Sequence, residues 1–266
     1  MNRQLCGMFA ALGAAALIVG CSSPSSEPAS STAEGSAAPA ETTGEITVFA
    51  AASLKATFSE LGAQLEQAHP GTKVNFNFAG SSDLVAQLTQ GAPGDVFASA
   101  DENNMVKAQE AGLIAGDPVD FATNTLTIVT PPGNPKDIAS FADLAKPGTT
   151  VVVCAPQVPC GSATQKVETQ TGVTLTPVSE ESAVTDVLGK ITSGQADAGL
   201  VYVTDARGAG DKVTEVPFPE AGSAVNTYPI GLLRESANST TAQQFIDLVT
   251  GPEGHAVLGG AGFATP

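Results

Sequence analysis

The sequence predicts an α/β fold for the segment from about residue 45 to residue 266. Two patterns support this prediction. Short runs rich in Val, Ile, Leu and Phe are typical of strands, and several are continuously apolar, as in parallel strands that are covered on both faces. Amphipathic helical stripes lie between these runs, and this alternation indicates α/β architecture with right-handed crossovers. The pattern does not tell one doubly wound sheet from two smaller sheets.

The expected elements follow from the spacing of apolar residues. The strand-like runs are Ile46–Ala50, Val74–Phe78, Val96–Ala98, Leu126–Thr130, Val151–Cys154, Gly199–Val203 and Ile230–Leu233. A helix places residues three and four positions apart on one face. The helical stripes are Leu54, Phe58, Leu61 and Leu65; Leu84, Val85 and Leu88; Val184, Leu188 and Ile191; and Phe245, Leu248 and Val249.

The composition excludes several classes of function. The chain has 266 residues, and 11 Lys and Arg stand against 27 Asp and Glu, which gives a formal net charge of -16. This balance argues against nucleic-acid binding, which needs Lys and Arg for phosphate contacts, and against attachment to anionic lipid through a basic patch. There is no Trp and there are only two Tyr residues, so an aromatic platform for sugars or bases is not expected.

The N-terminal residues have the layout of an export signal. Arg3 precedes an apolar run from Leu5 to Val19, and a small residue follows. The segment Leu17–Cys21 resembles a bacterial lipobox, which implies that residues 1–20 are a lipoprotein signal peptide and that Cys21 carries the lipid. The protein is then expected outside the cytoplasm, anchored to the outer face of the cell membrane. The alternative is an ordinary signal peptide with an incidental cysteine.

Residues 21–44 are expected to be the lipidated cysteine followed by a disordered tether. Between Ser22 and Gly44 there is no Leu, Ile, Val, Met or aromatic residue. Such a segment buries too little apolar surface to offset the entropy lost on ordering. The folded part is therefore predicted to begin at Glu45.

The cysteines fit an exported protein. Cys6 leaves with the signal peptide and Cys21 is the lipid site, which leaves Cys154 and Cys160. Outside the cytoplasm a disulfide is the default for such a pair. The alternative is two unpaired small apolar residues. No direct metal ligands are expected, because His69 and His255 lie far from this pair in sequence and are interpreted as surface residues near helix ends.

Three strand-to-helix junctions combine small residues with a hydroxyl group or bare backbone. They are Phe49–Leu54, Phe78–Leu84 and Val158–Ala163. The first N–H groups of a helix lack partners within the helix, and the helix dipole adds about half a positive charge there. Such junctions can bind an anion without Lys or Arg, at the strand ends where α/β sheets bind ligands. The alternative is that each serine only caps its helix.

Residues 46–54 closely resemble the opening of the molybdate-binding proteins of ABC importers. The likeness continues through Phe78–Ser82, Gly91–Asp101, Val158–Gly161, Gly199–Tyr202, Tyr228–Ile230, Gly251–Glu253 and Gly262–Phe263. It implies a type II bilobed periplasmic-binding-protein fold with two α/β lobes joined by two crossing strands and a ligand cleft between the lobes. The crossings are expected near residues 124–130 and 227–232. Lobe one is then 45–124 plus 229–266, and lobe two is 125–228.

The resemblance also implies a tetrahedral dianion, molybdate or tungstate, held by neutral donors. Ser53 and Ser81 would give hydroxyl and backbone N–H groups, Cys160 and Val184 backbone N–H groups, and Tyr202 its phenol hydroxyl. At position 160 the family often has Ala, so a disulfide there could rigidify the loop or its sulfur could crowd the anion. Alternatively, Val184 is a core contact and Tyr202 a strand residue with a packed ring. Two nearby acidic residues, Asp83 and Asp101, are expected to cap or complement helix starts.

The resemblance implies a membrane permease with its ATPase as the partner, a monomeric protein, and no cofactor, with molybdenum present only as the bound oxyanion. Three other functions remain open. The ligand could be another tetrahedral oxyanion such as sulfate or thiosulfate. The chain could be an enzyme, although it contains no G-x-S-x-G, H-E-x-x-H or G-x-x-x-x-G-K-[ST] motif. It could also be a surface adhesion or sensory lipoprotein that reuses the fold.

Overall fold

The computed structural model describes residues 44–266. The expected signal peptide (1–20), the lipid site Cys21 and residues 22–43 of the expected tether lie outside the described residues. Gly44, which the sequence assigned to the tether, belongs to the folded unit, because its carbonyl oxygen accepts a hydrogen bond from the backbone N–H of Lys73 (3.1 Å). In residues 44–266 there is no helix with the length and apolar character needed to cross a membrane.

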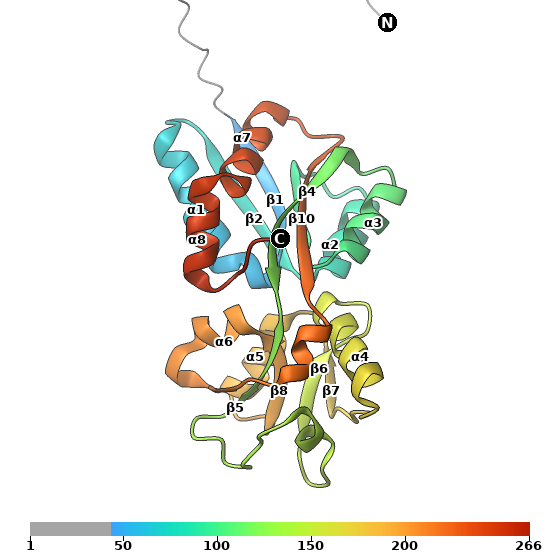
Figure 1. Ribbon diagram of the computed structural model, residues 1–266. Coiled ribbons are helices and arrows are strands. Elements are labelled where there is room, and N and C mark those ends of the chain that lie inside the picture. Colours follow the sequence, from blue (N-terminus) through green and yellow to red (C-terminus); the bar gives the residue numbers. More distant parts are fainter. Residues whose placement is uncertain (1–43) are drawn as a thin grey trace, which may run out of the picture. The chain divides into compact units, whose positions relative to one another are not determined.

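Two five-stranded sheets form two α/β lobes, which settles the alternative that the sequence left open (Figure 1). The first sheet has the order β2-β1-β3-β10-β4. Its strands are β1 (Glu45–Ala51), β2 (Lys73–Ala79), β3 (Val96–Ala98), β4 (Ile114–Asn124) and β10 (Asn226–Leu233). Helices α1 (Lys55–Ala68), α7 (Ser239–Thr250) and α8 (Pro252–Ala261) lie on one side of it, and α2 (Ser81–Thr89) and α3 (Glu102–Glu110) on the other.

The second sheet has the order β7-β6-β8-β5-β9. Its strands are β5 (Leu126–Thr130), β6 (Val151–Cys154), β7 (Ser179–Glu181), β8 (Ala198–Tyr202) and β9 (Thr214–Val216). Its helices are α4 (Pro159–Thr171), α5 (Val184–Thr192) and α6 (Val203–Ala209). Short 3-10 helices complete the described chain: η1 (Ala52–Leu54), η2 (Phe141–Ala145), η3 (Gly210–Lys212) and η4 (Pro219–Ser223).

Both sheets are mixed, so the expectation of parallel strands is only partly correct. β1 runs parallel to β2 and β3, and β6 runs parallel to β7 and β8. β10 is antiparallel to β3 and β4, and β5 is antiparallel to β8 and β9. The reversal has a topological reason, because β5 and β10 are the strands by which the chain enters the second sheet and returns to the first.

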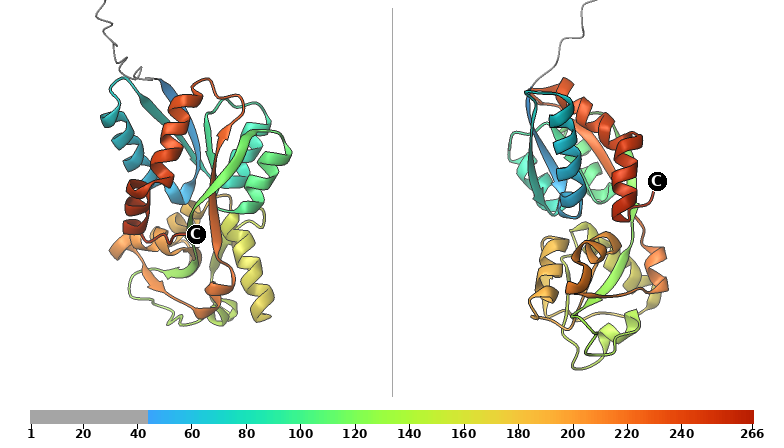
Figure 2. Two further views of the ribbon diagram at one scale, coloured as in Figure 1. Left: turned by 45° about the horizontal axis from the view of Figure 1, so that its top comes forward. Right: turned by 90° about the vertical axis from the view of Figure 1, so that its left-hand side faces the viewer.

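The connections between the lobes are short and lie side by side (Figure 2). Only Thr125 separates β4 in the first sheet from β5 in the second. The chain returns through η4 into β10, whose first residue, Asn226, pairs with Asn124 of β4. Strand pairing therefore places Thr227 and Tyr228 in the first sheet, whereas the sequence division ended the second lobe at residue 228. The division of the remaining residues between lobes stays a prediction.

The apolar stripes build the core largely as expected. Leu54, Phe58, Leu61 and Leu65 are all buried. Phe58 packs against Phe121 of β4 (ring centroids 5.7 Å) and edge-on against Phe245 of α7 (5.4 Å), which holds α1 and α7 on the first sheet. The α5 stripe differs in one position. Val187 is fully buried and Leu188 only partly, so the buried face is Val184, Val187 and Ile191.

Candidate functional site

A small cavity lies where helix starts from both lobes meet. It contains about 200 Å³ of empty space, which includes space open to solvent. Only about 10 Å³ of this space admits the centre of a water-sized sphere. Pockets for organic ligands typically have roughly 300–1,000 Å³, so the size suits a small ion. The lining residues come from η1 and from the starts of α2, α4 and α5, with one residue each from the ends of β1 and β8 and one from the loop after β3. They are Ala51, Ala52, Ser53, Gly80, Ser81, Ala100, Val158, Pro159, Cys160, Val184 and Tyr202.

All five residues predicted as ligand contacts line this one cavity. Ser53 lies in η1 and Ser81 begins α2, both in the first lobe. Cys160 lies in the first turn of α4, Val184 begins α5, and Tyr202 ends β8, all in the second lobe. The structure therefore brings them together, and their role in binding stays a prediction. The side chain of Val184 is part of the buried face of α5, which agrees with the alternative that this residue is a core contact. Its backbone N–H lies at the start of the helix.

The helix starts around the cavity carry no side-chain caps. α2, α4 and α5 begin after Gly80, Val158 and Ala183, and none of these residues makes a side-chain capping bond. α4 has Pro159 at its first position, where the missing N–H costs nothing. The alternative interpretation, in which a serine only caps its helix, therefore does not describe these three helix starts. The unpartnered N–H groups and the positive ends of three helix dipoles are directed at one small space.

The serine hydroxyls are bonded across the cavity wall instead. Ser53 Oγ lies 3.1 Å from Tyr228 Oη. Ser81 Oγ accepts a hydrogen bond from the backbone N–H of Ala100 (3.0 Å). Both serines are thus held by elements distant in sequence, which fixes their positions at the rim of the cavity.

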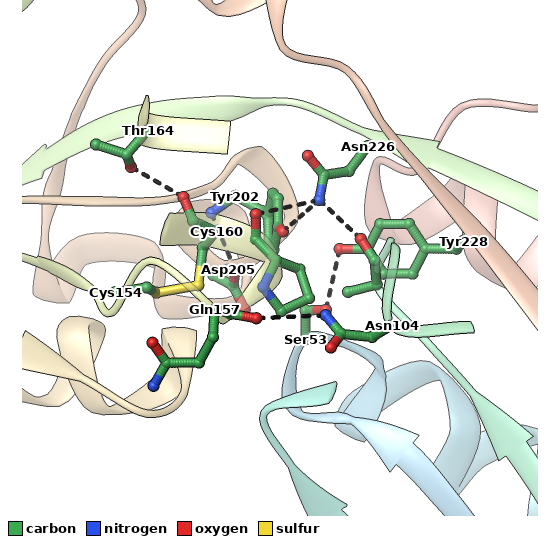
Figure 3. The surroundings of a disulfide bond; sticks show 12 residues. Ser53, Asn104, Cys154, Gln157, Cys160, Thr164, Tyr202, Asp205, Asn226 and Tyr228 are labelled. Atoms are coloured by element: carbon green, nitrogen blue, oxygen red, sulfur yellow. Dashed lines mark hydrogen bonds between the residues drawn. A yellow bond between two sulfur atoms is a disulfide. The ribbon is translucent and has the colours of Figure 1, made fainter. Parts of the chain in front are cut away.

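Tyr202 is held by a residue that the sequence reasoning missed. Its Oη accepts a hydrogen bond from Asn226 Nδ2 (2.9 Å), and Figure 3 shows this contact beside the disulfide. Burial, and after it the proximity of Tyr228, raises the pKa of Tyr202 well above its ordinary value, so the phenol stays neutral. Tyr228 belongs to a segment that resembles the family, but the sequence does not indicate what its hydroxyl contacts.

No charged side chain is among the residues that line the cavity. Asp101 lies nearby and caps α3, with its Oδ1 accepting from the backbone N–H of Asn104 (2.9 Å), as expected. Asp83 is in the first turn of α2, also as expected. Asp205 accepts from the backbone N–H of Tyr202 (3.1 Å), and burial of its carboxyl group raises the pKa of Asp205 to about 7.

Cys154 and Cys160 form the predicted disulfide, with their Cα atoms 5.6 Å apart. The bond joins the last residue of β6 to the first turn of α4 (Figure 3). The carbonyl oxygen of Cys160 accepts from Thr164 Oγ1 (2.9 Å). The start of α4 is therefore tied covalently to the sheet directly beside the cavity.

The two lobes touch around the cavity. A Cβ on Gly80 of the first lobe would overlap the carbonyl oxygen of Ser182 in the second, so only glycine fits this contact. Asn104 Nδ2 of α3 donates to the carbonyl oxygen of Gln157, just before α4 (3.4 Å). The described chain is therefore in a closed arrangement. Across residues 44–266, no group of three or more His, Cys, Asp or Glu side chains could hold a metal ion.

Two lobes that close on a small cavity of uncharged donors define a solute-binding protein. The chain belongs to the bacterial extracellular solute-binding protein family, whose model matches residues 46–264. It is 52% identical to the molybdate-binding protein ModA of Mycobacterium tuberculosis, over 98% of this chain and 97% of that protein. The molybdate-binding protein ModA of Escherichia coli is 30% identical, over 83% of this chain and 89% of its own.

A solved structure agrees with this assignment. The periplasmic molybdate-binding protein of Azotobacter vinelandii matches with a TM-score of 0.72 and 25% identity, over 83% of this chain and 99% of that one. The bilobed fold expected from the sequence is thereby confirmed. The relatives are solute-binding proteins and not enzymes, which agrees with the classification as a binding protein.

Proposed function

We propose that this protein captures molybdate, and tungstate as well, outside the cytoplasm and delivers it to an ABC importer. The observation that supports the proposal is the small cavity, which is lined by Ser53, Ser81 and Tyr202 and at which α4 and α5 begin. The similarity to relatives named as molybdate-binding proteins supports the same ligand.

Neutral donors suit a transported oxyanion. A hydrogen bond to a charged group contributes about 1.5–3 kcal/mol, so several that converge offset the dehydration of a dianion. Binding of the oxyanion depends on the positions of the donors and is lost when the lobes separate. A rigid set of donors also selects by size, because an oxyanion smaller than molybdate, such as sulfate, cannot touch every donor at once. Ser53, Ser81, Cys160, Val184 and Tyr202 are the residues proposed to hold the ion.

The proposal extends to attachment and partners. Cys21 would carry the lipid that holds the chain at the membrane, and residues 22–43 would be the tether between the lipid and the folded part. The partner would be a membrane permease with a cytoplasmic ATPase, and the binding protein would act as a monomer without a cofactor. Replacing Cys21 by Ala should move the protein from the membrane fraction to the soluble fraction of the cell. Retention of the C21A variant in the membrane fraction would contradict the anchor.

Isothermal titration calorimetry against molybdate, tungstate, sulfate, thiosulfate and phosphate tests the ligand. Molybdate and tungstate should bind tightest and raise the melting temperature most, since a ligand that binds only the folded state stabilises by RT ln(1 + [L]/Kd). Tighter binding of sulfate or thiosulfate would assign the cavity to another tetrahedral oxyanion. If none of the five anions binds, the proposed function is wrong.

A further inference from the structure

The side-chain amide of Asn226 lies buried between the two lobes, at the start of β10. Its Nδ2 lies 2.7 Å from the carbonyl oxygen of Ala100 in the first lobe and 2.9 Å from Tyr202 Oη in the second. The carbonyl oxygen of Pro159 is further away, at 3.5 Å. Figure 3 shows the amide directed at Tyr202. One side chain thus links both walls of the cavity.

The carbonyl oxygen of Ala100 fixes which way the amide points. A carbonyl oxygen can only accept a hydrogen bond, so the nitrogen of Asn226 and not its oxygen must face it. The same nitrogen faces Tyr202. An amide nitrogen cannot accept a hydrogen bond, so Tyr202 Oη must be the acceptor, and the phenol proton of Tyr202 has to point elsewhere.

Two neighbours are available to the Tyr202 proton. Tyr202 lines the cavity itself, so its proton can point straight into it. On the other side is the phenol of Tyr228, whose ring centroid is 6.0 Å away. Tyr228 Oη in turn lies 3.1 Å from Ser53 Oγ, and either of these two hydroxyls can be the donor. A fully deprotonated oxyanion can only accept, so it draws the Tyr202 proton into the cavity.

Ser81 is linked to the same amide through Ala100. Its Oγ accepts from the backbone N–H of Ala100, whose carbonyl oxygen accepts from Asn226. The Ser81 hydroxyl therefore still has its proton to donate. The amide of Asn226 thus contacts Tyr202 on one wall directly and Ser81 on the other through one peptide group.

We propose that Asn226 is a positioning residue that holds the Tyr202 hydroxyl as a donor to the bound oxyanion. The inference rests on the proposed function. Molybdate presents four acceptor oxygens and can take the Tyr202 proton. Hydrogen phosphate brings one O–H group, which a Tyr202 oxygen already occupied by Asn226 does not accept, so at this position it gains less than molybdate.

Asn226→Leu tests this role, because leucine has a similar shape and no donor. Titration calorimetry with molybdate should show about a 3- to 20-fold loss of affinity. Inorganic phosphate, measured by competition against molybdate, should bind equally well or better, because Tyr202 Oη is then free to accept. The molybdate-to-phosphate ratio should fall. An equal loss for both anions would mean a merely structural role and would overturn the inference.

A double-mutant cycle with Tyr202→Phe gives the second readout. If Asn226 acts through the Tyr202 hydroxyl, adding N226L to Y202F should cost at most about a further twofold in molybdate affinity. Losses that multiply would contradict the inference. Asn226→Thr is the substitute if N226L does not fold, because threonine suits a strand and its single O–H group can donate to only one partner. If the unaltered chain binds no molybdate, the proposed function fails, and the same cycle with sulfate tests Asn226 separately.

Discussion

Gly80 of the first lobe packs so closely against Ser182 of the second that any Cβ on Gly80 would overlap the carbonyl oxygen of Ser182. Gly80→Ala should therefore hinder closure. Forced overlap costs about 1–3 kcal/mol, which corresponds to roughly a 5- to 150-fold loss of oxyanion affinity. Titration calorimetry measures this loss, and thermal melting without ligand should change little, because the open arrangement has room for the methyl group.

Gly189→Ala is the matched control for this prediction. Gly189 lies in α5, and a Cβ there would meet nothing within 4 Å. Alanine is the better helix former, so the G189A variant should keep full affinity and melt at the same or a higher temperature. If G80A binds as tightly as the unaltered chain, the Gly80 contact plays no part in closure.

The cavity serines should matter individually. Ser53→Ala and Ser81→Ala each remove one hydroxyl donor to a charged ligand and should weaken oxyanion binding by about 10- to 150-fold. Ser82→Ala is the control, because Ser82 Oγ is buried without a partner and is not among the residues that line the cavity. S82A should bind as the unaltered chain does. Unchanged affinity in the S53A variant by calorimetry would remove Ser53 from the site.

The disulfide should stabilise both the fold and the site. The disulfide joins residues six positions apart in sequence. In the chain-entropy account, closing so short a loop lowers the entropy of the unfolded chain and raises the free energy of unfolding by about 2 kcal/mol. A reducing agent should therefore lower the melting temperature, and oxyanion affinity should fall because the start of α4 is no longer tied to β6. The double variant C154A/C160A should melt lower from the outset and be insensitive to reductant. A reductant effect of equal size in that variant would contradict this account.

Asp205 should make stability depend on pH. Burial raises the pKa of this carboxyl group from 3.8 to about 7. Between pH 4 and pH 7 the folded chain keeps the proton that the unfolded chain has lost, so this group makes the free energy of unfolding fall as pH rises through that window and then level off. Asp205→Asn keeps an acceptor for the Tyr202 N–H and removes the titration. Urea unfolding at pH 5 and pH 8 should show a smaller decline for D205N, with higher stability at pH 8.

Asp143→Asn provides a control of opposite sign. The hydrogen bond from Lys146, with those from the start of η2, lowers the pKa of Asp143 from 3.8 to about 2. A lowered pKa contributes stability above about pH 4 that is lost as pH falls toward 2. D143N should therefore be less stable than the unaltered chain at pH 8 and approach it in acid. If D205N and D143N shift stability at pH 8 in the same direction, the assignment of these two groups is wrong.

Most strands that sequence reasoning found are buried on both faces; the exception is β2, an edge strand that is largely half-buried. Val96–Ala98, Leu126–Thr130 and Val151–Cys154 occur with the expected bounds, because a continuous apolar run is both the signal and the cause of a covered strand. β4 was missed. It lies at a sheet edge, where polar residues, Pro118 and Gly116 in the left-handed region are tolerated, and these residues conceal the apolar pattern. β7 and β9 are edge strands of three residues each and give no periodic signal.

The cavity was predictable where its chemistry is local. A serine or a bare N–H at a helix start is visible as small residues after an apolar run, and the family resemblance placed Tyr202. Asn226 and Tyr228 were missed because their roles depend on distant partners. Tyr228 meets Ser53 across 175 residues of sequence, and Asn226 meets Ala100 across 126. Nothing in the neighbourhood of either residue in the chain indicates which hydroxyl or carbonyl the fold will supply.

Asn226 starts a strand of one lobe, and the phenol it holds ends a strand of the other. Separation of the lobes would therefore part the amide from the ring. The Tyr202 hydroxyl would then lose the contact that orients it. Under the proposed function, the movement that opens the cavity would thus also weaken the hold on the oxyanion, and its release would need no separate trigger.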